Sequence, residues 1–283
     1  EGRMRNLLHA NFFRLFHSGA FRAAVAAEFA YALFIIGVTF YSIYIKESGQ
    51  FGLEEPLLFA FGTAGIIPVP MFIQAPFLSV YLGTEFSEGT IRNKLVSGRS
   101  KVAVYLSNWL TCMTASVLLA VLYLALVGAA VAPTGLPLKM PAGQLLLLAC
   151  CGLLAIAASA ALAAMAAMLI RNETKTVIVT LSAAIFVMFL ISFLTARLGE
   201  PEFMAVYDEL GRDVAGMIPN PNYLQPVPRS VCRFILDLLP TGQCLQISAR
   251  SAEQFWRMSL LSLSVIAAST AAGLLLFRRK DLK

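Results

Sequence analysis

Long apolar runs separated by short polar stretches dominate the pattern of the chain. A transmembrane helix needs about 20 predominantly apolar residues at ~1.5 Å of rise per residue. Six runs reach that length, and the second and third contain no formal charge. We therefore predict an all-α integral membrane protein with six transmembrane helices, at residues 22–45, 57–82, 102–130, 143–170, 176–196 and 257–277.

The polar segments between these runs predict the remaining organisation. Residues 1–21 are basic and amphipathic, which predicts a cytoplasmic interfacial helix and no cleavable signal peptide. Residues 22–283 then form one six-span membrane domain. Residues 197–256 are the largest polar segment. We expect short helices at 202–217 and 229–239, separated by prolines and either resting on the outer membrane surface or dipping into it.

The second predicted span is rich in residues that interrupt helices. Each of its prolines removes an intrahelical hydrogen bond that lipid cannot replace. We expect this span to be kinked or locally unwound, and shielded by neighbouring helices or a water-filled path. The residues concerned are Gly62, Gly65, Pro68, Pro70 and Pro76.

Composition agrees with a membrane protein. Hydrophobic residues make up 58% of the chain and charged residues 13%, against about 25% charged residues in a soluble domain. The net charge of +6 is explained by a positive inner face against anionic membrane lipid, so no nucleic-acid partner is predicted.

The distribution of cations predicts the orientation. Short segments on one side carry fourteen Lys and Arg, against Lys46 and Lys139 on the other. By the positive-inside rule both termini and residues 83–101 are cytoplasmic, and 197–256 is extracellular. We predict a multi-pass protein of the cytoplasmic membrane. The fourteen are Arg3, Arg5, Arg14, Arg22, Arg92, Lys94, Arg99, Lys101, Arg171, Lys175, Arg278, Arg279, Lys280 and Lys283.

Catalytic and metal-binding signatures are missing from the sequence. There is no phosphate-binding Gly-x-x-x-x-Gly-Lys-Ser/Thr loop, no zinc spacing and no nucleophile elbow, so we expect neither an enzyme nor a metal site. Cys232 and Cys244 both fall in the outward segment. A disulfide between them requires an oxidising compartment and a Cα separation that spacing alone cannot establish.

The polar stretch 85–98 between the second and third spans carries the most specific pattern. Glu88 precedes Arg92 by four residues, the favourable order for a helical ion pair. Ile91 and Leu95 make a small apolar face, and Gly98 can end a helix. This pattern predicts a short amphipathic helix that docks into a groove of a soluble partner.

The chain resembles the membrane subunits of type-2 ABC exporters, especially the small bacterial six-span permeases encoded apart from their ATPase. Its interfacial helix, spans, long outward connection and basic tail are similar to theirs. The Pro-rich centre of 197–256 departs from their pattern. The resemblance rests on Glu85-Phe86, Gly89-Thr90-Ile91-Arg92-Asn93-Lys94-Leu95 and Gly98-Arg99-Ser100-Lys101.

That resemblance implies how the chain works. Two permease copies, identical or related, would pair with two ATPase chains that hold ATP and Mg. The translocation path would lie at the permease interface, lined chiefly by the second and fifth spans. The coupling helix that contacts the ATPase would comprise Glu85, Phe86, Glu88, Gly89, Thr90, Ile91, Arg92, Asn93, Lys94 and Leu95.

The path residues favour an amphiphilic cargo such as a hydrophobic peptide, an antibiotic or a lipid. They are Glu28, Phe72, Phe77, Phe186 and Phe189. Glu28 lies within the first span, where a charge is costly unless it is paired, protonated or near the headgroups. Two alternatives stay open: an ion-coupled secondary transporter that uses Glu28, and a membrane immunity or scaffold protein that transports nothing. Co-purification with an ATPase chain separates the exporter from the first, and substrate-stimulated ATP hydrolysis separates it from the second.

Overall fold

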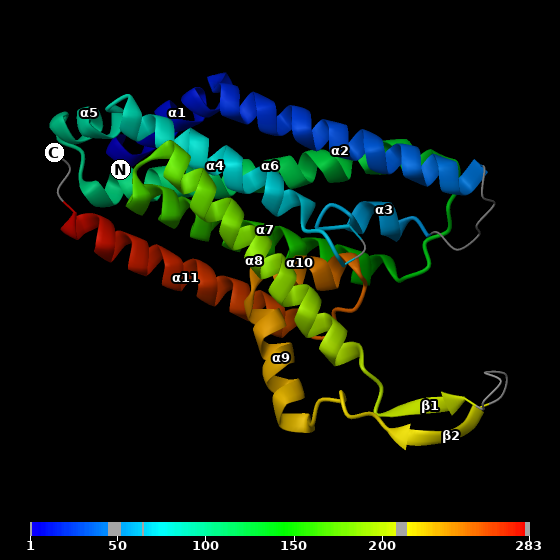
Figure 1. The fold of residues 1–283 in the computed structure, drawn as a ribbon. Helices are drawn as coiled ribbons and strands as arrows, with labels where there is room; N and C mark the ends of the chain where they lie inside the picture. Colours follow the sequence, from blue (N-terminus) through cyan, green and yellow to red (C-terminus); the bar gives the residue numbers. More distant parts are fainter. Residues whose placement is uncertain (1, 45–51, 64, 208–213, 281–283) are drawn as a thin grey trace.

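Most of the molecule is a bundle of long helices (Figure 1). The computed structural model describes residues 2–44, 52–63, 65–207 and 214–280. Within these residues five helices are long and apolar enough to cross a membrane. They are α2 (Gly19–Tyr44), α6 (Lys101–Val131), α7 (Ala142–Ile170), α8 (Glu173–Gly199) and α11 (Phe255–Arg279). A short 3₁₀ turn, η1 (Ala132–Thr134), extends α6.

The predicted second span, 57–82, is interrupted, as expected from its prolines and glycines. The chain forms a short helix α3 (Glu54–Leu58), leaves helical structure, and starts α4 (Val69–Ser87) after Pro68. The break has a local cause, because Pro68 and Pro70 cannot donate backbone hydrogen bonds and Gly65 adopts a φ of +75°. Among described helices, α4 is thus a sixth long member of the bundle that begins later than predicted.

Neighbouring elements satisfy the backbone of this interrupted stretch, as predicted for an unwound segment in a membrane. Thr63 donates its amide to the Ile67 carbonyl at 2.8 Å, and the Tyr31 hydroxyl of α2 donates to the Phe59 carbonyl at 2.9 Å. The amide of Gly65 donates to the Ser248 hydroxyl at 3.0 Å. The broken stretch is therefore held between α2 and the segment that contains Ser248.

Small residues allow the central helices to approach closely. α4 packs against α2, α7 and α8, and α7 packs against α11 and α6. At Gly83 a side-chain Cβ would lie 2.6 Å from the Cα of Glu173, so only glycine fits where α4 meets the start of α8. On α7 the buried face consists largely of alanines, at Ala155, Ala158, Ala160, Ala161, Ala164 and Ala167.

The outward segment differs from its prediction in one part. Where the structure describes residues 202–217, at 202–207 and 214–217, there are strands in place of the expected helix. β1 (Phe203–Tyr207) and β2 (Val214–Pro219) pair as an antiparallel hairpin, with Phe203 opposite Pro219. The short run Phe203–Tyr207 suits a strand, and Pro201 and Pro219 limit the hairpin. The helix expected at 229–239 is confirmed as α9 (Pro226–Leu238), followed by α10 (Pro240–Ser248). α10 is buried against α7 rather than lying on the surface.

The two ends of the bundle are different in kind. α1 (Gly2–His17), the short helix α5 (Thr90–Val96) and the end of α11 gather at one end, while the hairpin extends from the other (Figure 1). Lys101 binds the carbonyls of Arg278 and Lys280 at 3.2 and 2.8 Å, which joins the start of α6 to the end of α11. We call the end with α1 and α5 the basic end, since cations collect there.

Candidate functional site

A buried carboxylate anchors the polar stretch that the sequence singles out. Glu85, in the last turn of α4, has a fully buried side chain. Arg14 of α1 places Nη2 at 2.9 Å from its Oε1, and Lys94 of α5 pairs with the same oxygen. Asn108 of α6 donates its amide to Oε2. One side chain thus joins four helices.

Asn11 of α1 closes the network around Glu85. Its amide donates to Oδ1 of Asn108 at 2.7 Å, and its own Oδ1 accepts from Lys94 Nζ at 2.8 Å. The Tyr81 hydroxyl donates to the Asn11 carbonyl at 3.0 Å. We call Asn11, Arg14, Glu85, Lys94 and Asn108 the inner ion cluster. These ion pairs and hydrogen bonds fix α5 relative to α1, α4 and α6, although Arg14 Nε is buried without a hydrogen-bond partner.

Burial and charge pairing have opposite effects on the cations of the inner ion cluster. Burial lowers the pKa of Lys94, and the attraction and hydrogen bond from Glu85 oppose that effect. The Arg14 guanidinium lies 4.2 Å from the centre of the Tyr81 ring, which provides a second favourable contact for its charge. Two cations share one carboxylate, so losing that carboxylate would leave two partly buried charges without compensation.

The structure corrects which face of α5 is available to a partner. Ile91 is 2% exposed and belongs to the main apolar core, and Leu95 packs against that core. The predicted apolar docking face therefore points into the chain's own bundle. Arg92 and Asn93 are exposed, and Val96 is 80% exposed.

The predicted ion pair between Glu88 and Arg92 also needs correction. Gly89, with φ +68°, caps α5, so Glu88 terminates α4 and does not share a helix with Arg92. No ion pair joins these two residues in the described part of the chain. Phe86 is partly buried against the core, and Thr90 is the first residue of α5.

The five predicted path residues do not come together. Glu28 is buried between α2 and its neighbours, while Phe72 and Phe77 line a hollow of about 500 Å³ between α2 and α4. Phe186 and Phe189 lie on the outer face of α8 and are 67% and 65% exposed. Sequence periodicity alone does not reveal which aromatic side chains share a surface.

A groove that the sequence did not identify lies between α4 and α8, with α7 and the start of α10 completing it. Its volume is about 210 Å³, and its walls are mainly small or apolar, including Met71, Ala163 and Val187. Gln74 and Thr180 add polar groups. The two helices are those of the second and fifth predicted spans, but the lining is not aromatic.

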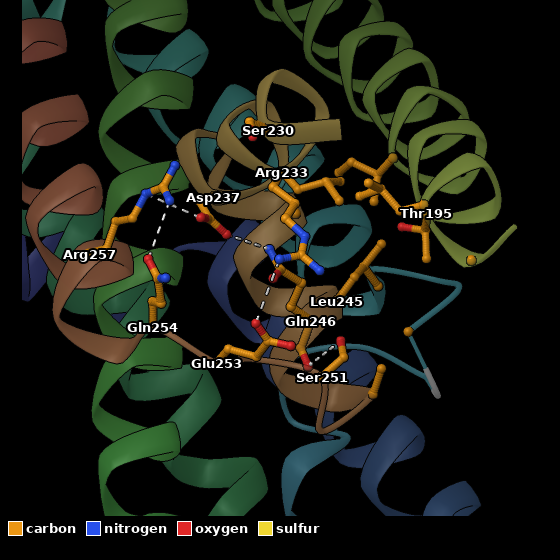
Figure 2. Close-up of a pocket in the computed structure, with 17 residues that line it drawn as sticks. Thr195, Ser230, Arg233, Asp237, Leu245, Gln246, Ser251, Glu253, Gln254 and Arg257 are labelled. Carbon is orange, nitrogen blue, oxygen red and sulfur yellow. Dashed lines mark hydrogen bonds and ion pairs between the residues drawn. The ribbon is translucent and has the colours of Figure 1, made fainter. Parts of the chain in front are cut away.

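A larger pocket of about 460 Å³ lies where α8, α9, α10 and α11 meet, away from the basic end (Figure 2). Asp237 of α9 is among the residues that line it. Arg257 Nε lies 3.4 Å from Oδ2 of Asp237, and Gln246 donates to Oδ1 at 3.2 Å. Arg233 faces the exposed Glu253 at 4.0 Å. The pocket offers charges of both signs next to apolar walls, a combination suited to amphiphilic molecules.

Two further groups of residues near this pocket relate to the sequence predictions. Cys232 and Cys244 are free thiols rather than a disulfide. Cys244 is fully buried in the core around α7, whereas Cys232 packs against a separate cluster on α9. An ion cluster that no sequence pattern indicated joins Arg250 to Glu55 at 2.9 Å and to the buried Glu54 at 3.4 Å.

The sequence contained signals for part of what was missed. Asn108 is a polar amide inside a charge-free apolar run, which is unusual in lipid, and Arg14 lies on the amphipathic helix predicted at the inner surface. Neither signal identifies Glu85 as the shared partner. That pairing depends on how α1 and α6 pack, which local patterns do not specify.

Comparison with known proteins places the chain in a family. Residues 27–224, most of the chain, match the sequence profile described as ABC-2 family transporter protein. The match includes α4, α5 and the inner ion cluster except for its α1 members. A search for similar curated proteins finds no match.

Proposed function

The chain belongs to the ABC-2 family of transporter proteins, and on that premise we propose that it couples a separate ATPase to export through α5. The family makes it a multi-pass membrane subunit of an ABC transporter that works with an ABC ATPase subunit. The proposal adds the element that transmits the motion, the orientation and the kind of cargo.

The inner ion cluster is the observation that carries the coupling proposal. A helix that receives force from a soluble partner must be rigidly joined to the membrane helices that move. α5 has only seven residues, yet Lys94 and Ile91 fasten it to α4 and to the main core. A push on α5 would therefore reach α4, α6 and α1 together. The exposed residues Arg92, Asn93 and Val96 form the surface for the ATPase.

The proposed contact between α5 and the ATPase also implies the orientation of the chain and the number of its membrane spans. If α5 meets a cytoplasmic ATPase, the basic end is cytoplasmic and the hairpin end is extracellular, in agreement with the positive-inside rule. Six crossings then require α4 to span the membrane alongside the five longer apolar helices. Its 19 residues cover about 28 Å at ~1.5 Å per residue, close to the hydrocarbon thickness of about 30 Å.

We propose an amphiphilic cargo that uses the groove between α4 and α8. The groove combines apolar walls with a few polar groups, and the mixed-charge pocket of Figure 2 lies farther toward the outward end. The apolar outer face of α8 remains uncovered and is suited to a second permease copy or to lipid. Its exposed members include Ile178, Ile185, Phe186, Phe189 and Phe193. ATP and Mg would bind the ATPase chains.

The test changes the exposed surface of α5 without touching its buried face. The double variant Arg92→Glu, Val96→Asp should insert and fold normally, because both side chains are exposed. It should lose co-purification with the ATPase subunit or lose ATP-driven export. Val227→Asp, an equally exposed change on α9, is the matched control and should keep both. If the double variant retains full ATPase binding and export, α5 is not the coupling element.

A further inference from the structure

Glu28 is an acid buried in the middle of an apolar helix. It lies on α2, and only 2% of the residue is exposed. It borders a small cavity of about 10 Å³ formed by α2, α4, α6 and α7. The cavity's other polar members are Gln74 of α4 and Ser116 of α6, and the rest of its lining is apolar or proline.

The surrounding side chains provide no compensating charge for Glu28. Within the described residues no Lys, Arg or His forms an ion pair with it, and its Oε1 is buried without a hydrogen-bond partner. The Ser116 hydroxyl is likewise buried without a partner. A carboxylate in this setting would be very unfavourable as an anion.

The titratable groups nearest to Glu28 are already engaged elsewhere. They are Tyr31 on its own helix and Tyr123 on α6; the α4 and α7 residues lining the cavity are not titratable. Tyr31 donates its hydroxyl to the Phe59 carbonyl at 2.9 Å, and Tyr123 donates to the Pro56 carbonyl at 3.0 Å. Neither phenol is therefore available to donate to Glu28.

Gln74 is engaged as well, and its bonds connect Glu28 to the groove. Its amide donates to the Ile156 carbonyl at 3.2 Å, and its Oε1 accepts from Ser159 at 2.7 Å. Gln74 lines both the cavity at Glu28 and the groove between α4 and α8. The Gln74 side chain therefore lies between Glu28 and the groove.

The size of the cavity decides what neutralises the acid. A volume of about 10 Å³ admits one water molecule at most, so neither an amine-bearing cargo nor a hydrated metal ion fits beside Glu28. A proton needs no such space. We propose that Glu28 is a proton-binding site, which holds its proton in this arrangement of helices, next to Ser116.

The release of that proton follows from the position of α4. Gln74 moves with α4, and Pro76 removes one backbone hydrogen bond in the middle of that helix. When α4 moves away from α7, which breaks the contacts of Gln74 with Ile156 and Ser159, water from the groove reaches Glu28. The carboxylic acid then transfers its proton to water to leave a hydrated carboxylate. This release step rests on the proposed function, whereas the bound proton does not.

Infrared spectroscopy of the full chain in lipid nanodiscs tests the bound proton directly. At neutral pH we expect a carbonyl band of a protonated carboxylic acid, shifted by exchange into heavy water. Glu28→Gln should abolish the band, while the exposed control Glu202→Gln should keep it. Ser116→Ala should shift its frequency, since the acid loses the hydroxyl that lines the same cavity. This variant supplies an independent readout if Glu28→Gln does not fold.

The outcomes separate this proposal from the coupling proposal. If the wild-type chain shows no such band, or if the band persists unchanged in Glu28→Gln, the proton site is wrong; neutralisation by a sodium or potassium ion would also give no band. The measurement needs no ATPase, so it stands if α5 does not couple. In the complete complex, the pH dependence of export should be weakened by Glu28→Gln, and an unchanged pH profile would overturn the release step.

Discussion

At the scale of single residues, Glu85 has the largest structural role. The sequence places it next to the predicted coupling helix, and the structure shows that it joins α1, α4, α5 and α6. Glu85 and Lys94 could be selected from the polar stretch 85–98. The contacts of Arg14 and Asn108 with Glu85, and of Asn11 with Lys94, could not be predicted, because they depend on the packing of helices distant in sequence. Whether a charged side chain is buried depends on tertiary packing, even when the sequence shows where the charge is.

Replacing Glu85 tests this role. Glu85→Gln keeps the shape but leaves Arg14 and Lys94 without their anion, so we expect a loss of about 3 kcal/mol in stability, the low end for a broken buried pair. The measurement is the thermal midpoint of the purified permease. Glu88→Gln, an exposed neighbour, should change it little. Adding Lys94→Met to Glu85→Gln should restore part of the loss, and an equal midpoint for Glu85→Gln and wild type would contradict the account.

At the scale of elements, apolar periodicity predicts where helices form better than it predicts what each helix face contacts. The helices α2, α6, α7, α8 and α11 follow directly from the apolar runs. The run at 57–82 is interrupted, as its prolines and glycines predict, and α4 begins only after Pro68; hydropathy alone does not register this interruption. In α5, a small apolar face was interpreted as a docking face. The same pattern is produced by a helix that packs against its own bundle, as Ile91 does.

Truncating the two faces of α5 distinguishes these interpretations. Ile91→Ala should destabilise the permease itself by about 2–5 kcal/mol, because it removes a side chain from the packed core. Val96→Ala should leave stability nearly unchanged, since that side chain is 80% exposed. Denaturation of both variants without any ATPase present is the measurement. A stable Ile91→Ala variant would restore Ile91 as a partner-facing residue.

At the scale of the whole molecule, the two ends of the helix bundle contain different elements and different charges. The basic end gathers α1, α5 and the end of α11, while the hairpin extends from the opposite end (Figure 1). The pocket of Figure 2 and the Glu54–Arg250 cluster lie away from the basic end. Charge counting predicted this division without any knowledge of packing, because the positive-inside bias is a global property of the sequence. The hairpin and the burial of α10 could not be predicted, since they depend on contacts with α7 and α9.

We propose that the exposed face of α5 contacts the ATPase. The most direct measurement is photo-crosslinking in native membranes, with a photoreactive amino acid at Val96 and, as a control, at Val227 near the other end; both positions are highly exposed. We predict a covalent adduct between position 96 and the ATPase subunit, and none from position 227. Absence of an adduct at position 96 in complexes that still co-purify, or an ATPase adduct at position 227, would contradict the account.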